Sequence, residues 1–219
     1  MTEIFERARK NMVINQLRPN KIKEEKILKI FEITPKENYL ETNLGKNCYL
    51  DKNLDITKKR GYLKNLHLAQ IIKYSEISPD DKVLHIGGLT GYFSTIISYL
   101  CKELLVVEEN RQLFKLLEQN IKNINTENIH IFNKHLLEGL PEKSPYDLII
   151  IDGPIYEIND TLKNQLVNNN GRLVYIKKIY DNLSKAYKII KNQDLYSSEY
   201  LFDVMSSYQI QEQQEDFKF

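Results

Sequence analysis

The sequence has few cysteines, no long apolar run and almost no excess charge, and each shortage excludes a class of protein. Its two cysteines, Cys48 and Cys101, lie far apart and form no CxxC pair, which indicates plain thiols in a reducing compartment. No segment approaches the roughly 18 consecutive apolar residues of a membrane span. The 31 Lys and Arg residues balance 30 Asp and Glu residues, so no strong field favours nucleic acid or a membrane surface as partner. Residues 1–7 are charged and lack an apolar signal core, and we expect a cytoplasmic globular protein.

The most informative stretch is 82–92, which reads KVLHIGGLTGY. An apolar run, a glycine cluster and a helical pattern are typical of a turn that holds a nucleotide-like cofactor at the end of a parallel sheet. Glycine permits positive φ and close approach of the backbone, and we expect the first free amides of the helix to point at the ligand. Two positions are unusual: His85 stands where an acid commonly precedes the first glycine, and Leu89 stands at a middle glycine position.

Strand and helix patterns alternate from residue 83 onward. Apolar runs without polar alternation predict strands covered on both faces, and hence a doubly wound, mostly parallel α/β sheet. Two segments, 185–191 and 195–202, flank the polar turn 192–194 and predict a C-terminal antiparallel hairpin that completes seven strands. The expected strands are 83–86, 104–107, 129–132, 147–151 and 172–176, and the expected helices are 93–100, 111–122 and 159–168.

The N-terminal part predicts a helical extension and no second core. Apolar spacing favours one helix over 3–15 and a second that Asn20 caps and that stops before Pro35. We expect residues 1–64, this extension and the loop after it, to pack on an α/β domain spanning 65–219 as one compact unit.

The loop 36–64 is irregular and rich in polar residues. It is interpreted either as a substrate-facing segment or as a solvated connection, and the basic run 58–60 within it is expected to be solvated. A helix over 65–75 follows and leads to the first strand.

The ends of the expected strands form the candidate site, because ligands of open α/β sheets lie outside the carboxyl ends of the strands. Glu108 ends the second strand about 20 residues after the glycine turn, where an acid accepts hydrogen bonds from ribose hydroxyls. An acid at a strand end is also commonly a solvated carboxylate, but this spacing favours the ribose role.

The turn alone fits a dinucleotide or S-adenosylmethionine, and the antiparallel hairpin favours the methyltransferase arrangement. The strand ends gather Gly87, Gly88, Gly91, Glu108, residues 133–135 and Asp152.

Matching segments distributed along nearly the whole chain resemble the protein-L-isoaspartate O-methyltransferase family, in its bacterial branch with an N-terminal helical extension. The segments are 9–13, 15–20, 49–51, 83–84 with Gly87, 90–92, 106–108, 139–141, 145–149, 165–166, 171–174, 201–203 and 217–219.

This resemblance implies transfer of a methyl group from S-adenosylmethionine to the carboxylate of isoaspartyl residues in damaged proteins, as protein repair. A carboxylate is ionised at pH 7 and needs no general base, so the site mainly has to orient its reactants and exclude water. No metal is expected, because the four histidines lack the short fixed spacing of metal ligands. The resemblance implies a cofactor site made of His85, Gly87, Gly88, Thr90, Gly91, Tyr92, Glu108, Lys134, His135 and Asp152.

Several positions depart from the family pattern at this site. His85 replaces the acid before the turn, and Leu89 replaces a glycine, where positive φ costs about 1 kcal/mol for a side chain. Leu63 stands where the family has its substrate-side serine, so no catalytic residue is assigned. Lys134 or His135 takes the place of the acid that contacts adenine. Two alternatives stay open: a catalytically impaired binding protein with this fold, or a methyltransferase with another acceptor.

Overall fold

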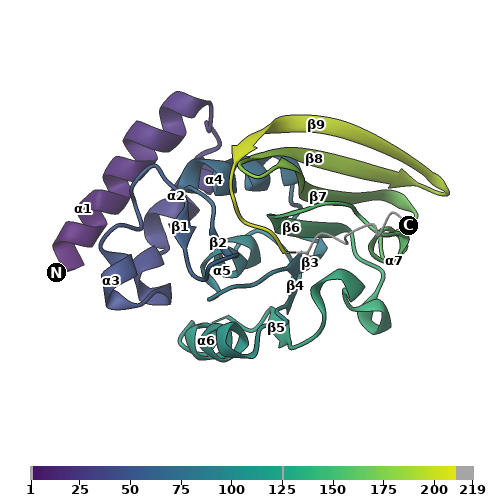
Figure 1. Ribbon diagram of the computed structural model, residues 1–219, viewed down its shortest axis with the longest axis horizontal. Helices are drawn as coiled ribbons and strands as arrows, with labels where there is room; N and C mark the ends of the chain where they lie inside the picture. The colour runs from purple at the N-terminus through teal and green to yellow at the C-terminus, as the bar shows by residue number, and fades with distance from the viewer. Residues whose placement is uncertain (1, 125, 211–219) are drawn as a thin grey trace, which may run out of the picture.

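A computed structural model describes residues 2–124 and 126–210 and shows a seven-stranded sheet (Figure 1). The strand order is β5-β4-β3-β6-β7-β8-β9. The first five of these are mutually parallel, and β8 is antiparallel to both β7 and β9. The predicted mostly parallel sheet with a C-terminal hairpin is therefore confirmed. The strands are β3 (Lys82–Ile86), β4 (Glu103–Val107), β5 (Ile129–Phe132), β6 (Leu148–Ile155), β7 (Asn169–Tyr180), β8 (Leu183–Asn192) and β9 (Leu195–Met205).

The helices match the sequence pattern closely where apolar periodicity is strong. Helices over 65–75 and 111–122 are confirmed with the expected bounds. The helix expected over 159–168 is shorter, because the backbone of 165–167 pairs with Tyr146 and cannot continue the helical turn. The helices are α1 (Thr2–Met12), α2 (Glu25–Ile33), α3 (Thr42–Gly45), α4 (Asn65–Ser75), α5 (Tyr92–Ser98), α6 (Arg111–Lys122) and α7 (Asp160–Lys163).

The N-terminal extension differs from the prediction in where its first helix ends and where its second helix begins. The first helix ends at Met12 and continues as a wider π turn through Leu17. Asn20 does not cap the second helix; it lies in a 3₁₀ turn, and its side-chain amide donates to the Gln16 carbonyl at 2.8 Å. Because Lys21 takes a left-handed conformation (φ 66°), the chain leaves the turn there and α2 begins only at Glu25.

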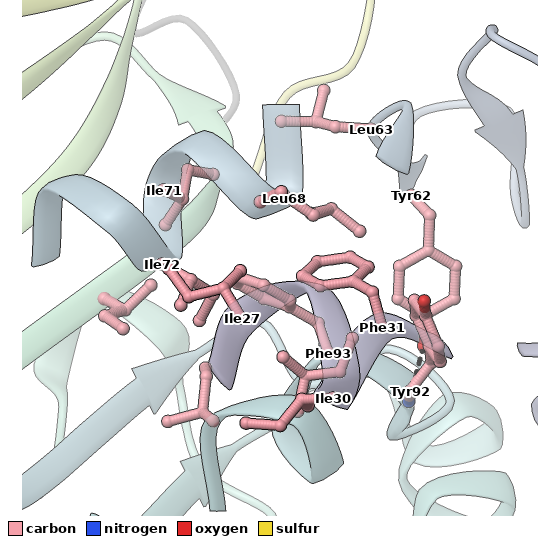
Figure 2. Close-up of a cluster of buried hydrophobic side chains, with 14 of the residues drawn as sticks. Ile27, Ile30, Phe31, Tyr62, Leu63, Leu68, Ile71, Ile72, Tyr92 and Phe93 are labelled. Atoms are coloured by element: carbon pink, nitrogen blue, oxygen red, sulfur yellow. Dashed lines mark hydrogen bonds between the residues drawn. The ribbon is translucent and has the colours of Figure 1, made fainter. Parts of the chain in front are cut away.

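Both faces of the sheet are buried at the central strands β3, β4 and β6, as their uniform apolar sequences predicted. Alternate residues of β3 enter different clusters: Val83 joins the larger one, and Leu84 and Ile86 join the smaller one. The larger cluster also contains apolar residues of α2, α4 and α5, so the N-terminal extension shares the core of the sheet. Figure 2 shows this contact, in which Phe31, Leu68, Ile72 and Phe93 lie together.

The loop 36–64 contains short elements and borders the carboxyl ends of the parallel strands. It includes a two-stranded antiparallel sheet, β1 (Leu54–Asp55) and β2 (Gly61–Tyr62), which brings the turn between them back toward the main sheet. Among the residues that the structure describes, no helix combines the length and the apolar character needed to cross a bilayer.

Candidate active site

The glycine turn between β3 and α5 has the backbone shape that the sequence predicted. Gly87 (φ 95°) and Gly91 (φ 99°) take positive φ, which glycine adopts without strain. Leu89 also has positive φ (49°) and its side chain is buried. A left-handed leucine costs about 1–2 kcal/mol relative to the right-handed form, so the turn keeps its shape at the expense of strain.

The amides on the outer side of the turn are bound to the protein itself. The N–H groups of Gly87 and Gly88 both donate to the carbonyl of Val107, at 2.9 and 3.3 Å. The N–H of Leu89 donates to Glu108 Oε2 at 3.0 Å. These three amides, which precede the helix, are therefore not free to bind a ligand.

The amides at the start of α5 are bound to Tyr62 of β2. Its hydroxyl accepts hydrogen bonds from the N–H groups of Thr90 (3.2 Å) and Tyr92 (3.1 Å), and lies 2.9 Å from Thr90 Oγ1. Burial raises the pKa of Tyr62 above its usual range, so the hydroxyl stays protonated and can donate to Thr90 Oγ1. The ring of Tyr92 packs edge-on against Tyr62 and Tyr39 (Figure 2 shows the first pair). Thr90 and Tyr92 thus lie in the contact with the N-terminal segment.

Glu108 lies at the end of β4 as predicted, and it is fully buried. Arg60 binds it with both ends of its guanidinium group: Nη1 to Oε1 at 2.6 Å and Nη2 to Oε2 at 2.7 Å. Oε1 also accepts the N–H of Asn110 at 2.9 Å. Burial lowers the pKa of Arg60, but the hydrogen bonds and charge of Glu108 outweigh burial and raise it overall, so the guanidinium group stays charged.

This ion pair corrects the prediction for the basic run 58–60. Lys58 and Lys59 are exposed, as expected. Arg60 is not solvated: its side chain is only 12% exposed, because the β1–β2 turn directs it onto Glu108. Arg60 was missed at the sequence level, since a contact between residues 48 positions apart has no local signature.

Asp152 and His85 form a second polar contact behind the turn. His85 Nε2 lies 3.4 Å from Asp152 Oδ1, and His85 Nδ1 lies 2.9 Å from Ser94 Oγ. The imidazole is fully buried and packs edge-on against Phe93, with ring centroids 5.5 Å apart. His85 therefore links β3, α5 and β6 from inside the fold.

A cavity of about 10 Å³ lies between the glycine turn and Asp152. Ile210 covers it: a Cβ atom built on Gly153 would lie 2.6 Å from Ile210 Cδ1, and one built on Gly87 would lie 3.3 Å from the same atom. Pockets for drug-sized ligands measure about 300–1,000 Å³, so this cavity alone is too small to hold S-adenosylmethionine. The cavity is lined by Arg60, Gly61, Gly87, Leu89, Asp152, Gly153, Tyr208, Gln209 and Ile210.

A larger hollow of about 480 Å³ lies on the outer side of Arg60 and Ile210. Residues 57–60, Glu109 and Asn110 also line it. Arg60, Gln209 and Ile210 line both the small cavity and this hollow, so these three side chains form the wall between them. Ile210 was missed by the sequence analysis, although an isolated apolar residue in the polar stretch 206–214 is a weak signal for a contact.

Lys134 and His135 lie at the same edge of the sheet, after β5, and are largely exposed. Lys134 Nζ is 4.0 Å from a Glu142 carboxylate oxygen, and His135 Nε2 is 3.9 Å from one of Glu109. Their adenine-contacting role stays a prediction. Within residues 2–124 and 126–210, no three His, Cys, Asp or Glu side chains gather as metal ligands.

The position of the family serine is part of the core. Leu63 is 1% exposed, and no hydroxyl is offered there. Two residues later, Asn65 Oδ1 accepts a hydrogen bond from the buried Lys36 Nζ at 2.9 Å, and Asn65 Nδ2 donates one to the Cys48 carbonyl at 3.1 Å. These residues fasten the N-terminal segment to α4.

The sequence and fold were compared with known proteins. The family described as Protein-L-isoaspartate(D-aspartate) O-methyltransferase matches residues 8–205. A relative named protein-L-isoaspartate O-methyltransferase from Koribacter versatilis is 26% identical over 170 residues, 78% of this chain and 76% of the relative. One of the same name from Shewanella halifaxensis is 28% identical over 183 residues, 84% of this chain and 85% of the relative.

Two solved structures share the fold over 91% of this chain. One is described as a protein-L-isoaspartate O-methyltransferase, with a TM-score of 0.77 and 21% identity; this chain spans 65% of its length. The other is described as a putative protein-L-isoaspartate O-methyltransferase from Plasmodium falciparum in complex with S-adenosyl-L-homocysteine, with a TM-score of 0.76, 18% identity and 97% of its length covered. The resembling segment 217–219 lies outside the described residues. Because the family match extends over most of the sequence, the chain belongs to the protein-L-isoaspartate(D-aspartate) O-methyltransferase family.

Proposed function

We propose that this chain is an S-adenosylmethionine-dependent carboxyl methyltransferase that acts on isoaspartyl residues of damaged proteins in the cytoplasm. The observation that carries the proposal is Glu108, a buried carboxylate at the end of β4 beside a turn whose glycines take positive φ. This is the placement from which an acid binds ribose hydroxyls. Relatives that match most of this chain carry the name of that activity.

The residues at the carboxyl edge have distinct proposed roles. Glu108 accepts hydrogen bonds from the ribose, and Lys134 and His135 border the adenine side. Gly87 and Gly153 allow close approach of the backbone where side chains would collide. The substrate carboxylate is ionised at neutral pH, so the chain has to position it and exclude water, which needs no general base.

A second candidate, a binding protein that keeps the fold without catalysis, is favoured by a specific observation. Amides of the glycine turn are bound to Val107, Glu108 and Tyr62, and the inner cavity holds about 10 Å³. Such a protein gives no methyl transfer and no heat with S-adenosylhomocysteine up to millimolar concentration.

The test is transfer of a labelled methyl group to an isoaspartyl peptide, measured beside its aspartyl twin. We expect label only on the isoaspartyl peptide, and loss of it in Glu108→Ala. Glu103→Ala is the matched control, because Glu103 starts the same strand at the opposite end and its side chain is 39% exposed. Cofactor binding with label on neither peptide would indicate another acceptor.

A further inference from the structure

Arg60 occupies the acceptor atoms of Glu108 that a ribose needs. An ionised carboxylate offers about four lone-pair positions. Here Oε1 accepts Arg60 Nη1 and Asn110 N, and Oε2 accepts Arg60 Nη2 and Leu89 N. The two donors of the guanidinium group take the places that the two hydroxyls of a ribose would take. Arg60 and a ribose therefore cannot bind Glu108 together.

The segment 208–210 holds the turn of Arg60 in place. Gln209 N–H donates to the Lys59 carbonyl at 2.9 Å, and Ile210 N–H donates to the Pro154 carbonyl at 2.8 Å. The Tyr208 hydroxyl donates to Asp55 Oδ1 at 2.7 Å. The segment thus bridges the β1–β2 sheet and the end of β6, and it places Ile210 over the glycines of the small cavity.

Displacement of Arg60 and Ile210 would open the cavity to the outer hollow. The two spaces share only the wall that these residues form with Gln209, and the hollow alone measures about 480 Å³. That volume lies within the range of pockets for drug-sized ligands. The closed state and an open, cofactor-sized cleft therefore differ by the position of one side chain and one short segment.

We propose that Arg60 and residues 208–210 form an internal latch that closes the cofactor cleft, and that the cofactor binds only after Arg60 leaves Glu108. This inference rests on the proposed function. The apparent affinity is then the intrinsic affinity multiplied by the open fraction, so a latch open in about a tenth of molecules weakens binding about tenfold.

The test is calorimetric titration of S-adenosylhomocysteine into the native chain and two latch variants, Arg60→Gln and Ile210→Ser. We expect each variant to bind at least about tenfold more tightly than the native chain. Ile210→Ser leaves the Arg60–Glu108 pair intact, so it reports on the latch even if Arg60→Gln folds poorly. Arg172→Gln is the matched control, because it removes the Arg172–Asp81 pair, which is similarly buried and lies away from the cleft.

Hydrogen exchange of the Gln209 and Ile210 amides tests the latch without any ligand. We expect both amides to be protected in the native chain, and to exchange faster in Arg60→Gln and on addition of S-adenosylhomocysteine. Exchange at the rate of an unprotected amide in the native chain would overturn the proposal. Equal affinity of the native chain and both variants would also overturn it while leaving cofactor use intact, whereas no heat in any variant would overturn the proposed function itself.

Discussion

Two buried arginine–carboxylate pairs lie at opposite ends of the parallel strands, and they serve different purposes. Arg172 binds Asp81 at 2.5 Å, and Asp81 also accepts the N–H of Ser78, so this pair fixes the turn that enters β3. Arg60 binds Glu108 at the carboxyl edge, where the fold places ligands, and it lines a cavity of about 10 Å³. The Arg172–Asp81 pair holds a turn, whereas the Arg60–Glu108 pair lies in the candidate cofactor site. Similar burial thus gives a structural contact in one place and a competitor for a ligand in the other.

The largest expected effect comes from removing the acid of each pair. Glu108→Ala and Asp81→Ala each leave a buried guanidinium group without its partner, which costs about 3–5 kcal/mol of unfolding free energy. Urea denaturation measures both losses. Only Glu108→Ala should also abolish binding of S-adenosylhomocysteine; unchanged affinity in that variant would remove the ribose assignment and with it the difference between the pairs.

Acidification is expected to reduce stability through His67, which belongs to neither arginine–carboxylate pair. Burial lowers the pKa of His67 from its ordinary value of 6.5 to about 4. Between these values the unfolded chain binds more protons than the folded chain, so stability falls as the pH drops from 6.5 to 4, by up to about 3 kcal/mol. Urea denaturation across this range should show a shallower fall in His67→Leu. The same fall in the native chain and the variant would contradict this cause.

Removing the Tyr62 hydroxyl, which binds amides on the inner side of the glycine turn, is expected to cause a smaller loss of stability. Tyr62→Phe removes the hydroxyl that accepts the N–H groups of Thr90 and Tyr92, and leaves both amides buried and unpaired. We expect a loss of about 1–3 kcal/mol in thermal or urea unfolding. Tyr146→Phe is a comparison, because its hydroxyl donates to a single carbonyl, that of Leu140. An equal loss in both variants would show that Tyr62 has no special role at α5.

Leu89→Gly should have the smallest effect on the cleft. It relieves about 1 kcal/mol of backbone strain at φ 49° and removes a side chain from the wall of the small cavity. We expect S-adenosylhomocysteine to bind a few-fold more tightly, and less than in the latch variants, because both Arg60 and Ile210 stay in place over the cleft. Unchanged or weaker affinity would contradict the steric role of Leu89.

The sequence predicted the parts of the fold that local physics determines. The bounds of α6 follow from its apolar stripe and from Asn110, whose side chain accepts the N–H groups of Gln112 and Leu113. The α7 prediction was too long, because pairing of its end with Tyr146 is a contact between distant residues. The hairpin of β8 and β9 was predicted from the polar turn 192–194 between segments 185–191 and 195–202.

The site could be predicted only in part, for the same physical reason. Strand order and spacing placed Glu108 beside the glycine turn. What binds Glu108 depends on Arg60, 48 residues away, and the cover of the cavity depends on Ile210. Neither contact has a periodicity or a motif. The first amides of the helix were predicted to be free, but the N–H of Tyr92 donates to the Tyr62 hydroxyl, which comes from another strand.

The most direct test is the ratio of S-adenosylhomocysteine dissociation constants for the native chain and Arg60→Gln, measured by calorimetry at one pH and salt concentration. If Arg60 closes the cofactor site, both proteins bind S-adenosylhomocysteine measurably, and the dissociation constant of the native chain is at least about ten times that of Arg60→Gln. A ratio near one would show that Arg60 does not compete with the ribose for Glu108, and that its pair is structural like that of Arg172 and Asp81.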